Sequence, residues 1–282
     1  MHPLEAKALS KVNLFLEVKG RRPDGYHDID TVFMPLASPS DTIRISDASS
    51  GIVITSNDDS IPLDEKNLCW GAASKYAEAS SINPSWSIHI EKNIPVAAGL
   101  GGGSSDAATV LSLLNREYKC LSDDRLAELA LSIGADVPFF LNPLPSRAGG
   151  VGEKIVSLGF EAPDIPVLIL APGFPVSAAW AYKNRLDSER PEADRVDKIV
   201  NALKACDWKA LGPLLYNDLA PALYNKFPFL GMIRNKALES GACGCEISGS
   251  GPTLYAVFEN VDALPSARES LSRHFGSSLK IV

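Results

Sequence analysis

The feature that most constrains this chain is a glycine-rich segment that leads directly into a predicted helix. The segment from Pro95 to Asp106 reads PVAAGLGGGSSD, and four of the 21 glycines of the chain fall within positions 99 to 103. A loop of this kind lets backbone N–H groups approach a ligand closely, and the helix N-terminus adds a partial positive charge. The pattern predicts a phosphate-binding loop; the alternative is a flexible turn capped by Ser104 or Ser105.

The loop differs from the best-known phosphate-binding motifs. A P-loop needs a lysine directly after its last glycine, and no glycine of this chain is followed by lysine. A dinucleotide fingerprint needs a third glycine where Ser104 stands, and the protein-kinase signatures HRD and DFG are absent from the sequence. The loop is therefore assigned to another phosphate-binding family.

Composition excludes several other classes of protein. The chain has 282 residues, 45% of them hydrophobic, which suits roughly two domains of about 150 residues each, or one large α/β unit. Its formal net charge of -7 argues against sequence-independent nucleic-acid binding and against a basic membrane-binding patch. The five cysteines lack Cys-x-x-Cys spacing, and the sequence has no leader-like N-terminus and no run of about 18 apolar residues. These features predict a cytoplasmic protein with reduced thiols.

The hydrophobic pattern predicts mixed helices and strands. Strands are expected over 12–18, 43–45, 52–55, 86–90, 166–171, 246–247, 253–258 and 279–282, and helices over 67–79, 104–114, 123–132, 192–205, 228–240 and 262–273. The second half resembles a split β-α-β unit, so an α/β (α+β) architecture is predicted. The stretch 142–152, rich in proline and glycine, is the predicted crossing between two lobes, 1–150 and 151–282.

Two charged residues outside the loop could take part in chemistry. Asp136 follows a predicted helix and precedes Pro138 and two phenylalanines. A carboxylate beside an apolar wall suits proton acceptance or the orienting of a hydroxyl, whereas a turn or cap residue is the alternative. Lys11 stands at the mouth of the first predicted strand, two positions before Asn13. A lysine in such a place is usually solvated.

Two predicted turns carry further candidates. The segment Arg22–His27 reads RPDGYH, so a Pro-Asp-Gly turn should present Tyr26 and His27 together. Tyrosine can stack on a base and histidine can hydrogen-bond a base edge; His27 is the histidine that we consider functional. The segment Ser248–Thr253 reads SGSGPT and predicts a tight turn that can lie against another backbone or a phosphate.

Taken together and in this order, these segments resemble the GHMP small-molecule kinases over nearly the whole chain. The resemblance implies a two-lobed fold: an N-terminal lobe of the ribosomal-protein-S5-domain-2-like type, which binds ATP and carries the catalytic residues, and a C-terminal ferredoxin-like lobe that closes over the substrate cleft. The forms SKVNLFL, RPDGYH, GLGGGSSD and GADVP are most similar to members that act on cytidine-diphosphate methylerythritol in the non-mevalonate isoprenoid pathway. The implied reaction transfers the γ-phosphoryl group of ATP to the 2-hydroxyl of that compound.

The resemblance also implies a role for each matching residue. Asp136 is the catalytic carboxylate near the hydroxyl, Lys11 is its cationic partner, and Asn13 hydrogen-bonds the polyol or holds Lys11. Tyr26 stacks on the cytosine, His27 reads its edge, and Tyr182 forms the opposite aromatic wall. The implied ATP-binding residues are Pro95, Val96, Ala97, Ala98, Gly99, Leu100, Gly101, Gly102, Gly103, Ser104 and Ser105 of the loop, with Asn67 and Lys92 at the adenine end. Mg²⁺ bridges the ATP phosphates, and Ser105 is its one expected protein ligand.

Two other functions stay open at this point. One keeps the fold and changes the acceptor, to mevalonate, homoserine or galactose; Tyr26 and His27 argue against it, because those acceptors have no base to stack. The other is a catalytically silent nucleotide-binding relative, which would have no need for both Lys11 and Asp136. The expected partners are the two small-molecule substrates, with a monomer or a homodimer equally allowed.

Overall fold

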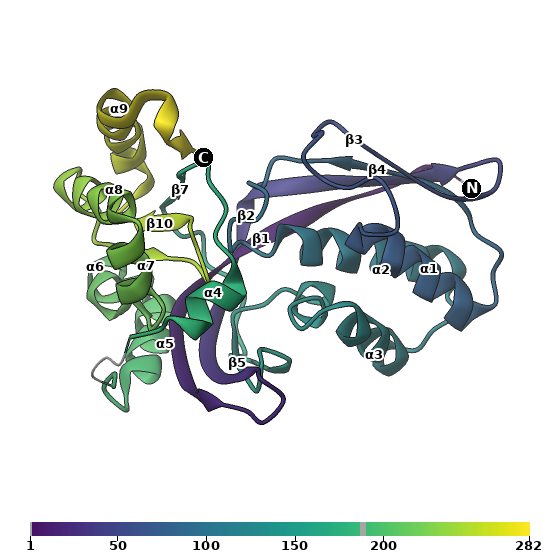
Figure 1. The fold of residues 1–282 in the computed structure, drawn as a ribbon, viewed down its shortest axis with the longest axis horizontal. Coiled ribbons are helices and arrows are strands. Elements are labelled where there is room, and N and C mark those ends of the chain that lie inside the picture. Colours follow the sequence, from purple (N-terminus) through teal and green to yellow (C-terminus); the bar gives the residue numbers. More distant parts are fainter. Residues whose placement is uncertain (1, 187–189) are drawn as a thin grey trace. The chain divides into compact units, whose positions relative to one another are not determined.

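The computed structural model describes residues 2–186 and 190–282, which form two compact units (Figure 1). Unit 1 comprises the chain up to Ser10 together with Ala37–Val96 and Gly101–Pro143, and unit 2 comprises Lys11–Leu36, Ala97–Leu100 and Leu144–Val282. The strands β1 (Leu4–Arg21) and β2 (His27–Asp47) therefore contribute residues to both units. The predicted assignment of ATP binding to 1–150 and of cleft closure to 151–282 stays a prediction.

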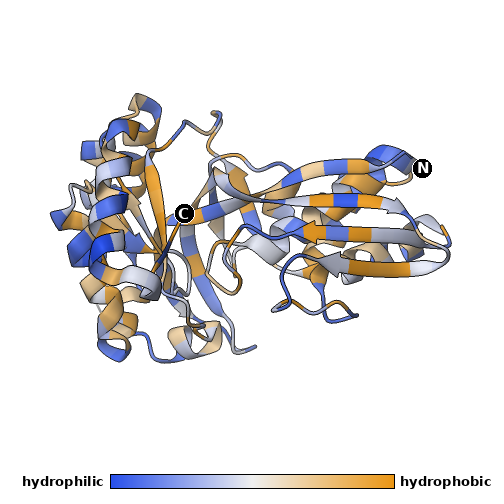
Figure 2. Ribbon diagram, turned by 90° about the horizontal axis from the view of Figure 1, so that it is seen from above, coloured by the Kyte–Doolittle hydropathy of each residue, from blue (hydrophilic) through white to orange (hydrophobic). Residues whose placement is uncertain are grey.

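Unit 1 is a sheet covered by helices. Strand β4 (Ser85–Glu91) pairs antiparallel with the end of β2 and parallel with β3 (Gly51–Ser56). Trp86, Ile88 and Ile90 alternate with polar residues and are buried, as the period of two predicts, and the strands show this banding in Figure 2. The helices α1 (Leu68–Ser80), α2 (Gly102–Tyr118) and α3 (Asp123–Ile133) lie on one side of these strands (Figure 1).

The helices of unit 1 begin and end at residues that are suited to capping. Asn67 caps α1 by accepting a hydrogen bond from the backbone N–H of Cys69, and Ser122 caps α3 through the N–H of Arg125. Helix α3 ends at Ile133, one residue beyond the predicted range 123–132, and Gly134 is its C-cap. Near the C-terminal end of α2, Asn115 hydrogen-bonds both backbone groups of Leu121. This side chain therefore fixes the turn between α2 and α3.

Unit 2 contains a four-stranded antiparallel sheet. Its strands are β7 (Val167–Ala171), β9 (Gly244–Ile247), β10 (Leu254–Val257) and β11 (Lys280–Ile281), in the spatial order β11-β7-β10-β9. Helices α8 (Pro228–Glu239) and α9 (Leu264–Phe275) pack on it. Both strand order and helix placement are those of a split β-α-β unit. The predicted ferredoxin-like arrangement is confirmed.

The remaining elements of unit 2 are short. The helices α4 (Ala178–Lys183), α5 (Arg195–Ala205), α6 (Trp208–Leu211) and α7 (Ala220–Lys226) follow β7 in the chain. Strand β8 (Tyr216–Asn217) pairs parallel with β1, and β5 (Ser146–Gly149) pairs with both β2 and β6 (Lys154–Ser157). The stretch 142–152, predicted as irregular, thus contains a strand.

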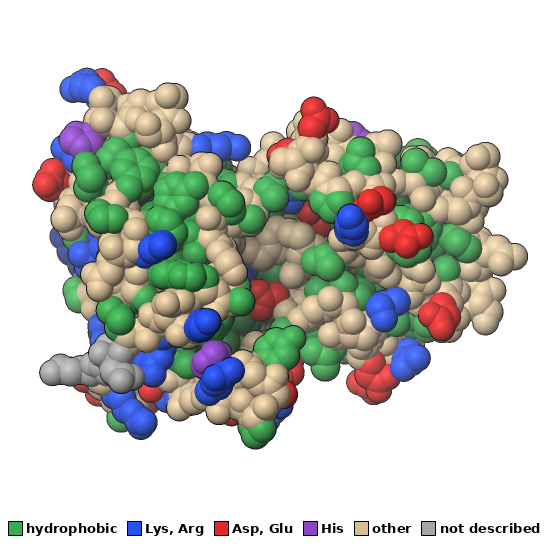
Figure 3. All heavy atoms as spheres, in the orientation of Figure 1, with side chains coloured by type: hydrophobic (Ala, Val, Ile, Leu, Met, Phe, Trp, Pro, Cys, Tyr) green, Lys and Arg blue, Asp and Glu red, His purple; other side chains and the backbone are tan. Residues whose placement is uncertain are grey.

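Surface chemistry agrees with the composition. On the face shown in Figure 3, acidic and basic side chains of unit 1 are interspersed, so this face carries no basic patch. All five cysteines are free thiols. Among the described residues, no helix has the length and the hydrophobicity required to cross a membrane.

Candidate active site

The predicted phosphate loop connects β4 to α2. Helix α2 begins at Gly102, and its cap, Gly101, has a φ of 73°. Ala97 and Gly99 also have positive φ values, 53° and 76°. Three left-handed residues within five positions turn the chain tightly enough to place free backbone N–H groups at the start of a helix of 17 residues, which suits an anion.

The turn Ser248–Thr253, here called the Ser248 turn, contacts the part of the loop that belongs to unit 2, Ala97–Leu100. The Ser248 hydroxyl donates a hydrogen bond to the Gly99 carbonyl at 2.9 Å, and the Lys11 N–H donates to the Leu100 carbonyl at 2.9 Å. A Cβ on Gly99 would lie 2.2 Å from the Ser248 carbonyl oxygen, so no other residue fits here without a backbone shift. The glycine turn that we predicted to lie against a backbone or a phosphate does lie against a backbone, that of the loop.

Lys11 and Asn13 form a buried polar chain in unit 2. The Lys11 ammonium donates to the Asn13 side-chain oxygen at 2.7 Å and lies 4.9 Å from the centre of the Phe33 ring. The Asn13 amide in turn donates to Thr31 at 2.8 Å. Lys11 is only 4% exposed, in contrast to the usual solvated lysine. The structure thus supports the expectation that Asn13 holds Lys11 in place, and it adds Thr31 to the chain.

Asp136 belongs to unit 1. It lies in the turn between Gly134 and a short 3₁₀ helix, Pro138–Leu141, and it is half-buried beside the buried Val137 and Phe139. The expected contact of its carboxylate with an apolar wall stays a prediction. The pairing of this carboxylate with Lys11 stays a prediction.

The three residues expected to recognise a base are all in unit 2. A turn closed by the Arg22 N–H and the Tyr26 carbonyl (2.7 Å) leaves the Tyr26 side chain 66% exposed. The rings of His27 and Tyr182 are stacked, with centroids 5.3 Å apart and planes inclined by 21°. Burial, together with Arg21 and Arg185, lowers the pKa of His27, which favours the neutral imidazole. The structure therefore brings His27 and Tyr182 into contact, and Tyr26 directly precedes His27 in the chain.

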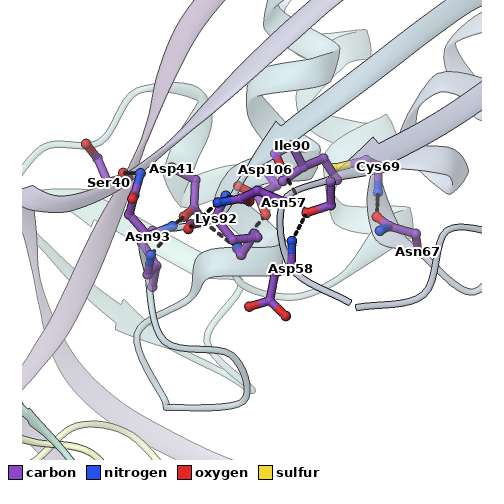
Figure 4. A network of polar contacts seen from close by, with 12 residues as sticks. Ser40, Asp41, Asn57, Asp58, Asn67, Cys69, Ile90, Lys92, Asn93 and Asp106 are labelled. Atoms are coloured by element: carbon purple, nitrogen blue, oxygen red, sulfur yellow. Dashed lines mark hydrogen bonds and ion pairs between the residues drawn. The ribbon is translucent and has the colours of Figure 1, made fainter. Parts of the chain in front are cut away.

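The two residues expected at the adenine end have structural partners in unit 1. The Asn67 amide donates to the Pro62 carbonyl at 2.7 Å while its oxygen caps α1. The Lys92 ammonium contacts the carboxylates of Asp41 and Asp106, the latter at 2.8 Å (Figure 4). Sequence reasoning missed Asp41, because it lies 51 positions from Lys92 and nothing local marks it. Asp106 was part of the quoted motif, and its position directly after the glycines is a signal that could have identified it.

The loop offers oxygen donors of the kind that Mg²⁺ takes. Among the described residues, no three or more His, Cys, Asp or Glu side chains form a metal-binding group. Mg²⁺ characteristically relies on substrate phosphates and water, with one or two protein oxygens. Ser105 carries a hydroxyl in the first turn of α2 but is only 1% exposed, so its role as a ligand stays a prediction.

Comparisons with known proteins agree with this geometry. Residues 67–142 match the family model of the GHMP kinases N terminal domain, and residues 199–277 match that of the GHMP kinases C terminal domain. A relative from Pelodictyon phaeoclathratiforme named 4-diphosphocytidyl-2-C-methyl-D-erythritol kinase is 36% identical, with 99% of this chain and 97% of the relative covered. A crystal structure of 4-(cytidine 5'-diphospho)-2C-methyl-D-erythritol kinase superposes with a TM-score of 0.84 at 36% identity, covering 96% of each chain. A homoserine kinase from Cytophaga hutchinsonii, with 19% identity, a TM-score of 0.75 and coverage of 100% of this chain and 93% of that one, shares the fold. The chain therefore belongs to the GHMP kinase family.

Proposed function

We propose that this protein transfers the γ-phosphoryl group of ATP to the 2-hydroxyl of 4-diphosphocytidyl-2-C-methyl-D-erythritol. The observation that carries the proposal is the stack of His27 on Tyr182, together with the exposed ring of Tyr26, the residue directly before His27 in the chain. Mevalonate and homoserine have no base, so neither acceptor could stack on these aromatic rings. Near full-length similarity to kinases with this name supports the same acceptor.

The aromatic residues explain how the acceptor is held. Cytosine lies between the rings of Tyr26 and Tyr182, since a base gains about 1–3 kcal/mol from an aromatic stacking partner. His27 leaves its stack on Tyr182 when the base enters and turns a ring nitrogen toward the base edge. A neutral imidazole has one donor and one acceptor nitrogen, which suits the mixed donors and acceptors of cytosine.

The phosphoryl group is transferred by positioning and charge. Asp136 orients the acceptor hydroxyl and takes its proton, while Lys11 supplies positive charge to the transferring group. The bonds from Lys11 to Asn13 and from Asn13 to Thr31 fix the ammonium before any substrate binds. Because phosphoryl transfer has a loose transition state, this preorganised charge contributes more than proton removal. Ser105 is the residue that would hold Mg²⁺, and the metal would supply charge neutralisation at the ATP phosphates.

The proposal also includes the cellular location and the partners of the enzyme. The enzyme works in the cytoplasm, where its five free thiols stay reduced. Its partners are ATP and the cytidine-diphosphate acceptor.

A coupled assay of ADP release tests the proposal directly. The purified chain is supplied with Mg²⁺ and ATP and, one at a time, with 4-diphosphocytidyl-2-C-methyl-D-erythritol, mevalonate, homoserine and galactose. We expect turnover with the first compound only. Faster turnover with mevalonate or homoserine would assign a different acceptor, and no ADP release with any alcohol from a chain that binds ATP would support the silent relative.

The Tyr26→Ala variant tests base recognition. Removal of an exposed stacking ring should raise the KM for the acceptor about tenfold or more, and leave the KM for ATP within about twofold of wild type. Met232→Ala removes another exposed apolar side chain, from α8, and should change neither constant. Equal increases of both KM values in Tyr26→Ala would contradict the stacking role.

A further inference from the structure

Three charged side chains are buried together in unit 1. Lys92, at the end of β4, contacts Asp41 of β2 and Asp106 of α2, and the three side chains are 5%, 0% and 4% exposed (Figure 4). The second oxygen of Asp106 is buried and accepts no hydrogen bond from any residue that the structure describes. Burying a lysine and two carboxylates is costly unless they are well paired. The presence of three buried charges in unit 1 therefore suggests a functional role for them in addition to packing.

The group joins the two ends of the phosphate loop. One oxygen of Asp41 accepts hydrogen bonds from the backbone N–H groups of Asn93 (2.6 Å) and Ile94 (2.8 Å), directly before the loop. Asp106 lies in the first turns of α2, directly after the loop. Lys92 bridges the two carboxylates, so the chain entering the loop is tied to the helix that leaves it.

Gly102 shows how closely these ends approach. A Cβ at this position would lie 3.1 Å from the Ile94 Cγ2 and 3.4 Å from the Lys92 Nζ. The first residue of the helix therefore lies against both the Lys92 ammonium and the Ile94 side chain. A change in the position of Lys92 would therefore move the backbone N–H groups at the start of α2.

We infer that Asp41, Lys92 and Asp106, here called the loop clamp, are positioning residues that hold the phosphate loop in its ATP-binding shape. The inference rests on the proposed function, since it takes ATP as the ligand of the loop. It gives Lys92 a role different from lining the adenine end: its ammonium binds the two carboxylates. The bond from Lys92 to Asp106 is the part that acts on the loop, because it alone reaches the helix.

Charge balance shows which variant will still fold. Burial raises the pKa of Asp106 to about 7, opposed by Lys92 and reinforced by Asp41. Burial also opposes the charge of Lys92, but Asp106 and Asp41 outweigh it, and the pKa of Lys92 is raised. Removal of Lys92 would leave two buried carboxylates without a cation and would unfold the unit. Removal of Asp106 leaves Lys92 and Asp41 as a neutral pair, so Asp106 is the residue to change.

The experiment compares Asp106→Ala, Asp106→Asn and Asn115→Ala. Affinity for the magnesium complex of a non-hydrolysable ATP analogue is measured by calorimetry, with both KM values and the unfolding temperature. Asp106→Ala should weaken the analogue and raise the KM for ATP about tenfold or more, because small displacements of positioning groups are costly. The KM for the acceptor should stay within about twofold. Asp106→Asn keeps an oxygen toward Lys92 and should recover most of the affinity.

Asn115→Ala is the matched control for a purely structural effect. It removes hydrogen bonds to Tyr76 and Leu121 near the other end of α2. We expect a lower unfolding temperature with unchanged nucleotide affinity. Three results would each overturn the inference of a loop clamp. They are unchanged affinity in Asp106→Ala, no recovery of affinity in Asp106→Asn, and a loss of affinity in Asn115→Ala in proportion to its loss of stability. The calorimetry needs no acceptor, so a wild type that binds the analogue and does not phosphorylate the cytidine compound would refute the proposed function alone.

Discussion

Replacement of Asp136 by asparagine is expected to lower kcat about a thousandfold, because general acid–base groups contribute roughly 10² to 10⁴ to a rate. Asparagine has the same shape, but it can neither take the acceptor proton nor act as a fixed negative charge. The residue is half-buried in a turn next to buried Val137 and Phe139, so the substitution leaves the packing intact. Affinity for ATP should not change, since the phosphate loop is unaltered.

Single-turnover measurements with saturating substrates give the rate of the chemical step for this variant. Asp123→Asn, an exposed carboxylate in the first turn of α3, makes the same chemical change in the same unit and should retain wild-type kcat. If Asp136→Asn retained a kcat within about threefold of wild type, Asp136 would be no more than a turn residue.

The second large effect is expected at Gly99. In Gly99→Ala a methyl group would lie 2.2 Å from the Ser248 carbonyl oxygen, at a φ of 76° that disfavours any residue with a Cβ. Strain and overpacking of this kind each cost about 1–3 kcal/mol, so the free energy of unfolding should fall by about 2–4 kcal/mol. The loop has to shift to relieve the contact, and the KM for ATP should rise about tenfold or more.

Denaturant unfolding and steady-state kinetics measure both effects on one preparation. The control is Gly231→Ala in α8 of the same unit, where the nearest atom to a new Cβ is 3.9 Å away. Alanine is the better helix former, so this variant should be slightly more stable and equally active. Wild-type stability and ATP affinity in Gly99→Ala would show that the loop does not depend on its contact with the Ser248 turn.

Local sequence patterns predicted helices and strands well where the hydrophobic periodicity runs without interruption. The alternation over 12–18 identified β1, and the alanine-rich segment after Asn67 identified α1 with its cap. Strand β2 was predicted only over 43–45, although it runs from His27 to Asp47. Pro35 and Pro39 interrupt the pattern, and the pairing of Thr31–Phe33 with β5 supplies a partner that no local window contains.

The candidate site shows the same division between local and distant information. The loop and the Tyr26–His27 turn could be found because their chemistry lies within a few consecutive residues. The burial of Lys11 could not be predicted, because its contacts come from other strands. Phe33 contacts Lys11, and Thr31 and Tyr255 hydrogen-bond Asn13. The partners of Lys92 were missed for the same reason: a buried charge is recognised only when the residues that neutralise it are known.

The discontinuous make-up of unit 2 has a consequence for synthesis of the chain. Its first segment, Lys11–Leu36, leaves the ribosome early, whereas the strands of its four-stranded sheet come from Val167 onward. Domains generally fold as units during translation, and contacts between distant segments slow the process. Leu16 and Val18 of this early segment are buried in one cluster with Leu168, Leu170 and Leu254, so these neighbours are made more than a hundred residues later. We therefore expect the apolar side chains of Lys11–Leu36 to stay exposed on the nascent chain until the second half of the protein has been made.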